Sequence, residues 1–190
     1  MKIGVVSDTH GYFDRRLTSV FEGVDAILHA GDVGSEAVLD QLRAIAPMQA
    51  VQGNVDSAAL GLALTVTQRF GSVGVHMLHA LPQSQAALRD WTQANHLEGK
   101  SAEHCRRFTE SFPGDCQVVI FGHSHEPCAH ILSGRLFFNP GSAGKKRFSL
   151  PRCCGFLEIS AQGVHATFAS LESYNEDLPE GVSLPIGGTK

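Results

Sequence analysis

The sequence predicts an α/β domain that contains a parallel sheet and a second sheet rich in hairpins. In the first third of the chain the order strand, polar strand end, helix recurs, which is typical of parallel strands joined by crossover helices. From residue 64 onward, apolar runs come in pairs around short turns, as antiparallel hairpins do. With 190 residues, of which 43% are hydrophobic and 18% charged, the chain suits one globular domain with a full core.

Charge and cysteine content exclude several classes of protein. The formal net charge of −4 and the pI near 6.2 argue against a surface for nucleic acids or other polyanions. Five cysteines without a Cys-x-x-Cys pair argue against a disulfide framework or a thiolate zinc site. No apolar run is long enough for a signal peptide or a membrane span. We therefore expect a cytoplasmic protein that does not contact a membrane, and the sequence leaves open whether it forms a homo-oligomer.

Three strands and two helices are expected in the first part of the chain. The strands are Ile3–Val6, Asp25–Ala30 and Met48–Gln52, and the helices are Arg15–Gly23 and Glu36–Ile45. In the second helix the apolar residues Val38, Leu42 and Ile45 recur at spacings of four and three, which places them on one face.

Polar residues follow each of these strands. Asp8 and His10 follow the first, Asp32 the second and Asn54 the third. Taken alone, Asp8 could be a helix N-cap and the Gly-Asn pair an ordinary turn. His29 lies within the pattern of its own strand, so we interpret it as a packed core histidine and not as a ligand.

The second part of the chain alternates hairpins with one helical insertion. The expected strands are Leu64–Phe70, Val73–Leu78, Val118–Phe121, Ala129–Leu132, Arg135–Phe138, Cys153–Ile159 and Val164–Phe168. Helices at Ser84–Asn95 and Ser101–Phe112 form an insertion near residues 84–112 that either covers the sheet or flanks the site. Residues 1–172 make up the single domain. Residues 173–190, which are polar and contain two prolines and a Gly-Gly pair, are expected to form a loose tail.

Two further strands of the second part end in histidine. His79 follows one of them, and Gly122-His123-Ser124-His125 follows the central apolar run. Imidazoles two residues apart can approach neighbouring points when the backbone is extended, and open α/β sheets bind ligands beyond the carboxyl ends of their strands. A plain polar turn after a core strand is the alternative for the pair at His123 and His125.

Five strand ends thus carry residues of the kind that bind metals. Mixed carboxylate, amide and imidazole ligands suit manganese, iron, zinc or nickel, and the seven residues are more than one ion needs. Two ions about 3.5–4 Å apart that share a carboxylate are the arrangement that clamps phosphoryl transfer. The motifs resemble those of the calcineurin-like metallophosphoesterases. They read Asp8-Thr9-His10, Gly31-Asp32, Gly53-Asn54, His79 and Gly122-His123-Ser124-His125. The short length of the chain and the turn Asn139-Pro140-Gly141-Ser142 look like those of the compact phosphodiesterase branch.

The resemblance implies a fold, a cofactor and a reaction. The fold would be a four-layer α/β/β/α sandwich with two mixed sheets. The first metal would be held by Asp8, His10, Asp32 and His125, and the second by Asp32, Asn54, His79 and His123. The cofactors would be two divalent ions, manganese foremost. Asp32, Asn54 and His79 would act at the phosphorus of a small phosphodiester or phosphate-ester substrate, which metal-activated hydroxide would attack in line.

Substrate contacts are expected from Asn54 and from the segment after the last hairpin of this region. The turn Asn139-Pro140-Gly141-Ser142 is rich in backbone amides that could face an anion, which makes Gly141 and Ser142 candidates. Lys145, Lys146 and Arg147 follow and could meet a phosphate, with Lys145 and Arg147 as the chosen candidates. The alternative is that this basic run is solvated surface.

The chain departs from the family pattern at two positions. Val55 stands where larger members have a histidine that protonates the leaving group and compact ones often have cysteine. Ala80-Leu81 follows His79 where the family has Gly-His. The compact branch also includes a retromer scaffold subunit without activity, so a scaffold that presents a sheet face to a partner protein is the rival interpretation. Retention of all seven ligands favours the enzyme.

Overall fold

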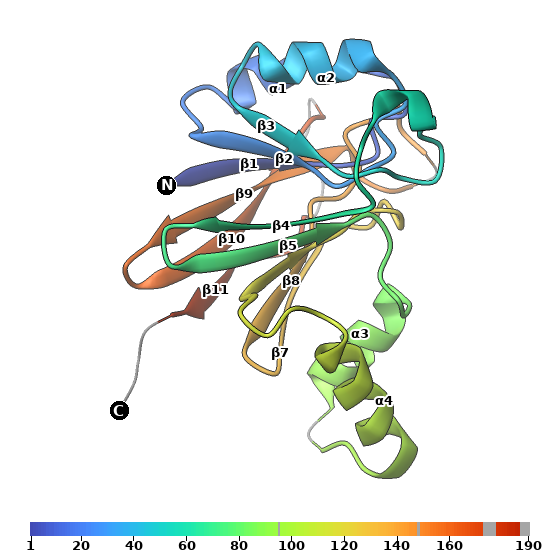
Figure 1. Cartoon of the computed structure of the whole chain (residues 1–190), viewed down its shortest axis with the longest axis vertical. Coiled ribbons are helices and arrows are strands. Elements are labelled where there is room, and N and C mark those ends of the chain that lie inside the picture. The colour runs from blue at the N-terminus through green and yellow to red at the C-terminus, as the bar shows by residue number, and fades with distance from the viewer. Residues whose placement is uncertain (95, 148, 173–177, 187–190) are drawn as a thin grey trace.

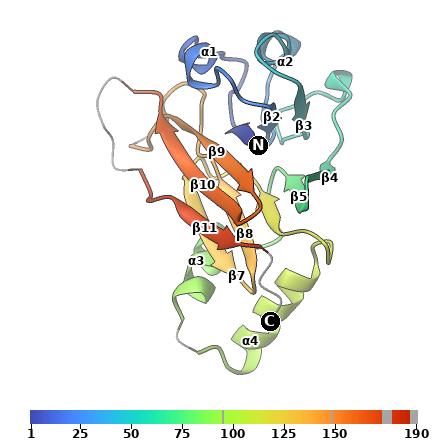
Figure 2. The same ribbon diagram turned by 90° about the vertical axis from the view of Figure 1, so that its left-hand side faces the viewer.

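Two sheets packed face to face, with helices on both outer faces, make up the molecule (Figure 1). The computed structural model describes residues 1–94, 96–147, 149–172 and 178–186. Helices α1 and α2 cover one sheet, and α3 and α4 lie against the other (Figures 1 and 2). The predicted four-layer α/β/β/α sandwich with two mixed sheets is confirmed.

The first sheet joins three parallel strands to an antiparallel meander. In spatial order its strands are β11 (Val182–Pro185), β10 (Gly163–Ser170), β9 (Cys153–Ser160), β1 (Lys2–Val6), β2 (Ala26–His29) and β3 (Met48–Ala50). Strand β1 pairs with β2 in parallel and with β9 in the antiparallel sense. The parallel half is the crossover arrangement that the sequence predicts. It places the loops after β1, β2 and β3 at the same edge of the sheet.

The second sheet has a parallel centre and antiparallel edges. Its strands, in spatial order, are β4 (Thr65–Phe70), β5 (Val73–Leu78), β6 (Val118–Ile120), β8 (Arg135–Asn139) and β7 (Cys128–Leu132). Strand β6 pairs in parallel with both β5 and β8. Both of its neighbours therefore run in its direction, and all three residues of β6 are buried, as the apolar run predicts.

Three apolar clusters hold the layers together. Val5, Leu28, Val75, Ile120 and Phe138 belong to the cluster between the two sheets. A second cluster joins the first sheet to α1 (Arg16–Val20) and α2 (Glu36–Arg43). The third joins the second sheet to α3 (Gln85–Gln93) and α4 (Gly99–Glu110). Burial of these side chains is the main stabilising contribution to the fold.

The inserted helices cover the second sheet with aromatic side chains. Trp91 of α3 lies against Phe108 of α4, and Phe108 stacks on Phe137 of β8 with ring centroids 5.2 Å apart. The sequence left two roles open for the insertion, to cover the sheet or to flank the site. Its buried aromatic face covers the sheet. A short 3-10 helix at Ala58–Leu60, which the sequence pattern does not predict, precedes β4.

The expectation of a loose tail at residues 173–190 is wrong for part of that segment. Val182–Pro185 forms β11, which pairs with β10 in the antiparallel sense, and Leu184 is buried. An additional strand satisfies the backbone groups of β10 that would otherwise form a bare edge, while Pro185 at its end hides the strand pattern. Residues 173–177 and 187–190 lie outside the described residues. None of the described helices is long and apolar enough to cross a membrane.

Candidate metal centre

All seven candidate ligands lie at one end of the sandwich, where loops of the two sheets meet. Loops after β1, β2 and β3 carry Asp8 and His10, Asp32, and Asn54, and loops after β5 and β6 carry His79, and His123 with His125. Backbone hydrogen bonds join these loops: Asp8 N–H donates to the carbonyl of Gly31, and Gly122 N–H donates to that of His79. The topology thus brings together residues that are up to 117 positions apart, from Asp8 to His125.

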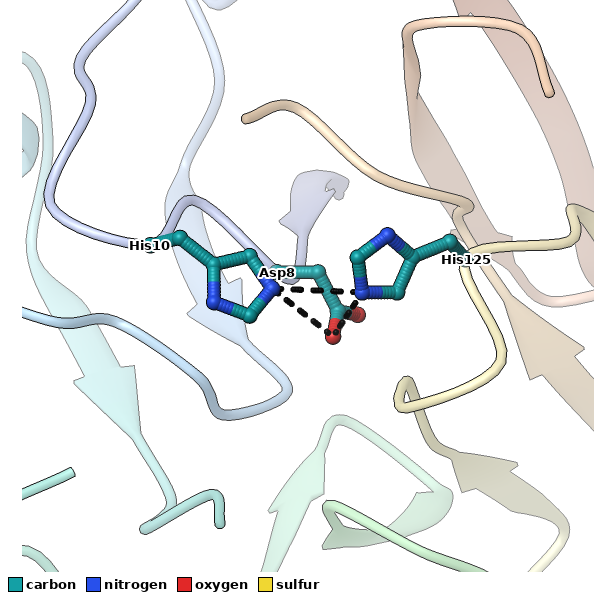
Figure 3. Close-up of side chains that lie close together, drawn as sticks. All are labelled: Asp8, His10 and His125. Carbon is teal, nitrogen blue, oxygen red and sulfur yellow. Dashed lines mark hydrogen bonds and ion pairs between the residues drawn. The ribbon is translucent and has the colours of Figure 1, made fainter. Parts of the chain in front are cut away.

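The first group of ligands consists of Asp8, His10 and His125 (Figure 3). The Nε2 atoms of His10 and His125 are 3.2 Å apart, and the Oδ1 atom of Asp8 lies 3.2 Å from His125 Nε2 and 3.9 Å from His10 Nε2. Two lone pairs on imidazole nitrogens repel each other at this distance unless a proton or a cation lies between them. The three side chains therefore converge as ligands of one ion do.

The second group extends through His79 to Asn54. His79 Nε2 lies 3.4 Å from Oδ1 of Asp32, and its ring centroid is 5.2 Å from that of His123. Asn54 Nδ2 donates to Nδ1 of His123 at 3.1 Å. These contacts form a continuous chain of potential ligands from Asp32 to Asn54.

Asp32 lies between the two groups. Its Oδ2 atom is 3.8 Å from His10 Nε2, while its Oδ1 atom faces His79 and accepts a hydrogen bond from the Val55 amide at 3.0 Å. One carboxylate oxygen is thus directed toward each group. Asp8, Asp32 and His79 also form a cluster of their own, in which the ligand atoms lie within 4.8 Å of one another.

Five of the seven residues have a left-handed backbone conformation. They are Asp8, His10, Asp32, His123 and His125, with φ between 49° and 70°. This region is disfavoured for residues with a Cβ, and among them Asp, Asn and His enter it most readily. Such conformations persist where the surrounding structure holds them, and they cluster at binding sites. The Asp-x-His and His-x-His patterns consist of residue types that tolerate this conformation, although the pattern alone does not predict it.

Glycines next to the ligands allow the close approach of the loops. A Cβ at Gly53 would collide with Asp32, and a Cβ at Gly122 would collide with Ser7 and Asp8. A larger residue would not fit at these two positions, which explains the glycine in the Gly-Asn and Gly-His motifs.

A buried carboxylate that the sequence analysis did not select ties two of the loops together. Asp56 accepts hydrogen bonds from the backbone amides of Val33, Gly34 and Gly53, at 3.2, 2.7 and 2.8 Å. It thereby fixes the loop that carries Asp32 against the loop that carries Asn54. No spacing pattern in the sequence distinguishes this aspartate from a surface residue.

The donor set fits divalent cations. Asp8 Oδ1 and His79 Nε2 are buried and have no hydrogen-bond partner in the described structure, which is costly for polar atoms unless an ion binds them. His79 Nδ1 donates to the carbonyl of Ala30 at 2.8 Å, so the lone pair of the ring is on Nε2, toward the site. Burial alone would raise the pKa of the Asp8 carboxyl, but His125 and the Ser7 hydroxyl outweigh it and hold that pKa below its ordinary value. Asp8 is therefore ionised at neutral pH, as a metal ligand must be.

His29 is a core histidine, as predicted. It is fully buried, its Nε2 atom bonds Thr9 Oγ1 at 2.9 Å, and its Nδ1 atom accepts from the Gly31 amide. Because the Thr9 hydroxyl donates to the carbonyl of Val33, it must accept from His29, which fixes the neutral tautomer. Burial lowers the pKa of His29 to about 4.

The residues predicted to contact the substrate differ in burial: some are buried and others are exposed. Gly141 and Ser142 are buried: the Gly141 amide donates to Asn139 Oδ1, and the Ser142 hydroxyl donates to the carbonyl of Asp8. The Ser142 hydroxyl thus supports the Asp8 loop, and the Gly141 amide is engaged within its own turn, so a contact of these two residues with a substrate stays a prediction. Lys145 and Arg147 are exposed. Burial lowers the pKa of His10, and the charge of Arg147 lowers it further. Lys146 Nζ lies 3.8 Å from Oε1 of Glu172.

Comparison with known proteins agrees with this geometry. The model of the calcineurin-like phosphoesterase superfamily domain matches residues 1–162. The chain belongs to this superfamily. It is 30% identical over 158 residues to a protein of Methanothermobacter thermautotrophicus named "Probable metallophosphoesterase", with 80% of this chain and 82% of the relative covered.

Solved structures of calcineurin-like phosphoesterase fold share the architecture. Vps29 of Chaetomium thermophilum superposes with a TM-score of 0.71 at 18% identity and 97% coverage of both chains. A protein described as a novel archaeal phosphodiesterase gives a TM-score of 0.64 at 21% identity, with 89% of this chain and 100% of that one covered. At these identities the likeness concerns the fold alone.

Val55, one of the departures from the family pattern, lies next to the candidate centre. The residue is 54% exposed, and its backbone amide donates to Asp32 Oδ1. His104, the alternative source of a proton, lies on the exposed face of α4.

Proposed function

We propose that this metallophosphoesterase is a dinuclear, metal-dependent phosphodiesterase. The observation that carries the proposal is the position of Asp32, with one oxygen 3.8 Å from His10 Nε2 and the other 3.4 Å from His79 Nε2. A carboxylate that faces two groups of ligands is what a bridged pair of ions requires.

The residues of the chain have distinct roles in the proposed reaction. Two divalent ions, manganese foremost, with iron, zinc or nickel as alternatives, would supply an activated hydroxide and neutralise charge on the phosphoryl oxygens. Asp8, His10 and His125 would hold one ion, His79, His123 and Asn54 the other, with Asp32 shared. Asn54 and His79 would orient a phosphoryl oxygen. The exposed cations Lys145 and Arg147 would add positive charge that attracts a phosphate ester.

A diester is favoured as substrate over a monoester by two features. A diester carries a single negative charge, and the two cations expected to contact the substrate, Lys145 and Arg147, come from one short exposed segment. The short length of the chain and the turn Asn139-Pro140-Gly141-Ser142 resemble those of the compact phosphodiesterase branch, and the fold neighbour described as an archaeal phosphodiesterase is consistent with this. The rival proposal is that the protein is a scaffold without activity. The similarity of its fold to that of Vps29 supports this alternative.

Hydrolysis of bis(p-nitrophenyl) phosphate distinguishes the two. Protein stripped with a chelator and reconstituted with manganese is expected to release p-nitrophenolate, and added chelator is expected to abolish the release. His79→Ala should abolish it as well, whereas His165→Ala, a change on β10 of the first sheet and outside the ligand set, should leave it intact. Absence of manganese-dependent hydrolysis in the parent protein would favour the scaffold.

A further inference from the structure

A groove of about 610 Å³ opens directly beside the candidate metal centre. One wall is the segment that joins β5 to α3, residues 80–85. The other wall is residues 121–124, which include the candidate ligand His123. If the phosphoryl group of a substrate lies at the metal ligands, one of its two ester arms can therefore reach into this groove.

Among the described residues that line the groove, His123 alone is acidic or basic. The apolar lining comes from Leu81 and Pro82, together with Phe121, which is 2% exposed. The polar groups are the side-chain amides of Gln83 and Gln85 and the hydroxyls of Ser84 and Ser124. This composition, with apolar walls and a few uncharged hydrogen-bonding groups, is that of a site for a neutral organic ligand, and the volume is in the usual range for one.

Most of the polar groups in the groove are already engaged. Gln85 Oε1 accepts from Ser124 Oγ at 2.7 Å, and its Nε2 donates to the carbonyl of Glu126. Ser84 Oγ accepts from the Ala87 amide at the start of α3. Gln83 is exposed and offers a donor and an acceptor to a ligand.

We propose that this groove binds one ester arm of the substrate, and that this arm is an uncharged, ring-bearing group of nucleoside size with hydrogen-bonding edges. The inference rests on the proposed phosphoesterase function and adds the class of substrate. An arm that carried a second phosphate or a carboxylate would lose water without gaining a cation, which is costly. The cations Lys145 and Arg147 are not among the residues that line the groove. The apolar faces of a neutral ring would gain about 25 cal/mol for each Å² that they bury.

Phosphinates with two identical arms test the groove independently of turnover, because their P–C bonds are not hydrolysed. The probes are bis(4-carbamoylbenzyl)phosphinate and bis(4-carboxybenzyl)phosphinate, titrated by calorimetry into the manganese-loaded protein. Whichever arm enters the groove is then neutral in the first probe and anionic in the second. We expect the carbamoyl probe to bind about tenfold more tightly or better.

A charge placed in the groove supplies the matched control. Gln83→Lys should reduce the preference for the carbamoyl probe to about threefold or less, because the new cation compensates the carboxylate. Gln93→Lys adds the same charge to the exposed end of α3, outside the groove, and should leave the preference unchanged.

Two outcomes overturn the proposal: equal affinity for the two probes, or the same effect from the changes at Gln83 and Gln93. Neither depends on catalysis. Failure to hydrolyse bis(p-nitrophenyl) phosphate would instead contradict the proposed function, so the two failures are distinguishable.

Discussion

At the scale of single residues, Val55 has the clearest consequence for chemistry. Its side chain can neither give nor accept a proton, and the resemblance places it where larger members of the family have the histidine that protonates the leaving group. General acid assistance is typically worth about 10²–10⁴-fold in rate. Without it, the leaving group must depart as an anion, and the rate of hydrolysis must depend on how stable that anion is.

The first prediction is therefore a steep dependence of kcat on the pKa of the leaving group. A series of aryl phosphodiesters should show kcat falling sharply as that pKa rises, with alkyl diesters much slower. Val55→His should flatten the slope, while Val55→Ala, which also lacks a proton donor, should keep it steep. A shallow slope in the parent protein that becomes steep in His104→Ala would show that His104 supplies the proton and would contradict the prediction.

His29 gives a prediction about stability and pH. Its pKa is lowered to about 4 by burial, so between the ordinary histidine value of about 6.5 and pH 4 the unfolded chain binds a proton that the folded chain does not. The free energy of unfolding should therefore fall as the pH falls through this window, by about 3 kcal/mol in total from this residue. His29→Asn removes the titrating group.

Urea denaturation of the chelator-treated proteins at pH 7.0 and pH 5.0 checks this expectation. The loss of stability between the two pH values should be smaller in His29→Asn than in the parent, although the variant is less stable at pH 7.0. The other histidines are common to both proteins and cancel in the comparison. An equal loss in both would mean that His29 does not titrate as its burial indicates.

At the scale of elements, most strands are predicted by apolar runs. A strand that is buried on both faces consists of consecutive apolar residues, which are easily recognised in a sequence. The strand β6 and the residues that follow it are the best example, since Val118–Ile120 and Gly122 are all buried. The strand β11 was missed because its four residues carry only two inward-facing apolar side chains and end in Pro185. Pairing with β10, and not its own pattern, makes it a strand.

The inserted helices also position the ligands, through Gln85 at the start of α3. Gln85 Oε1 accepts from Ser124 Oγ at 2.7 Å and from Asn139 Nδ2 at 3.2 Å. Ser124 lies between His123 and His125, both of which have a left-handed backbone. The loss of this acceptor would leave the half-buried Ser124 hydroxyl without its acceptor and loosen the loop, while Asn139 Nδ2 keeps the carbonyl of Gly122 as a partner at 3.0 Å.

We predict that Gln85→Leu weakens manganese binding by about tenfold or more, as loss of a group that supports ligands generally does. Gln85→Glu keeps an acceptor for Ser124 and Asn139 and should restore most of the affinity. Gln93→Leu at the far end of α3 is the matched control. Calorimetric titration of the chelator-treated proteins with manganese measures all three, and an unchanged affinity in Gln85→Leu would show that the insertion only covers the sheet.

At the scale of the whole molecule, the candidate centre joins the two sheets. Asp8, Asp32 and Asn54 come from the first sheet, and His79, His123 and His125 from the second. The sequence identifies these residues because each follows a strand and belongs to a motif. It does not identify Asp56 or Gln85, whose importance arises from contacts across the sandwich. Nor does it show that Gly141 and Ser142 face inward, since that depends on the packing of their loop behind Asp8.

The most direct test of the account is the metal content of the protein. Chelator-treated protein that is dialysed against manganese and then against metal-free buffer should retain close to two ions per chain by elemental analysis. Asp32→Asn should lower the content to less than one ion per chain, because both groups of ligands lose the shared carboxylate, whereas Asp40→Asn on the exposed face of α2 should leave it at two. A content of one ion or none in the parent protein would contradict the dinuclear centre.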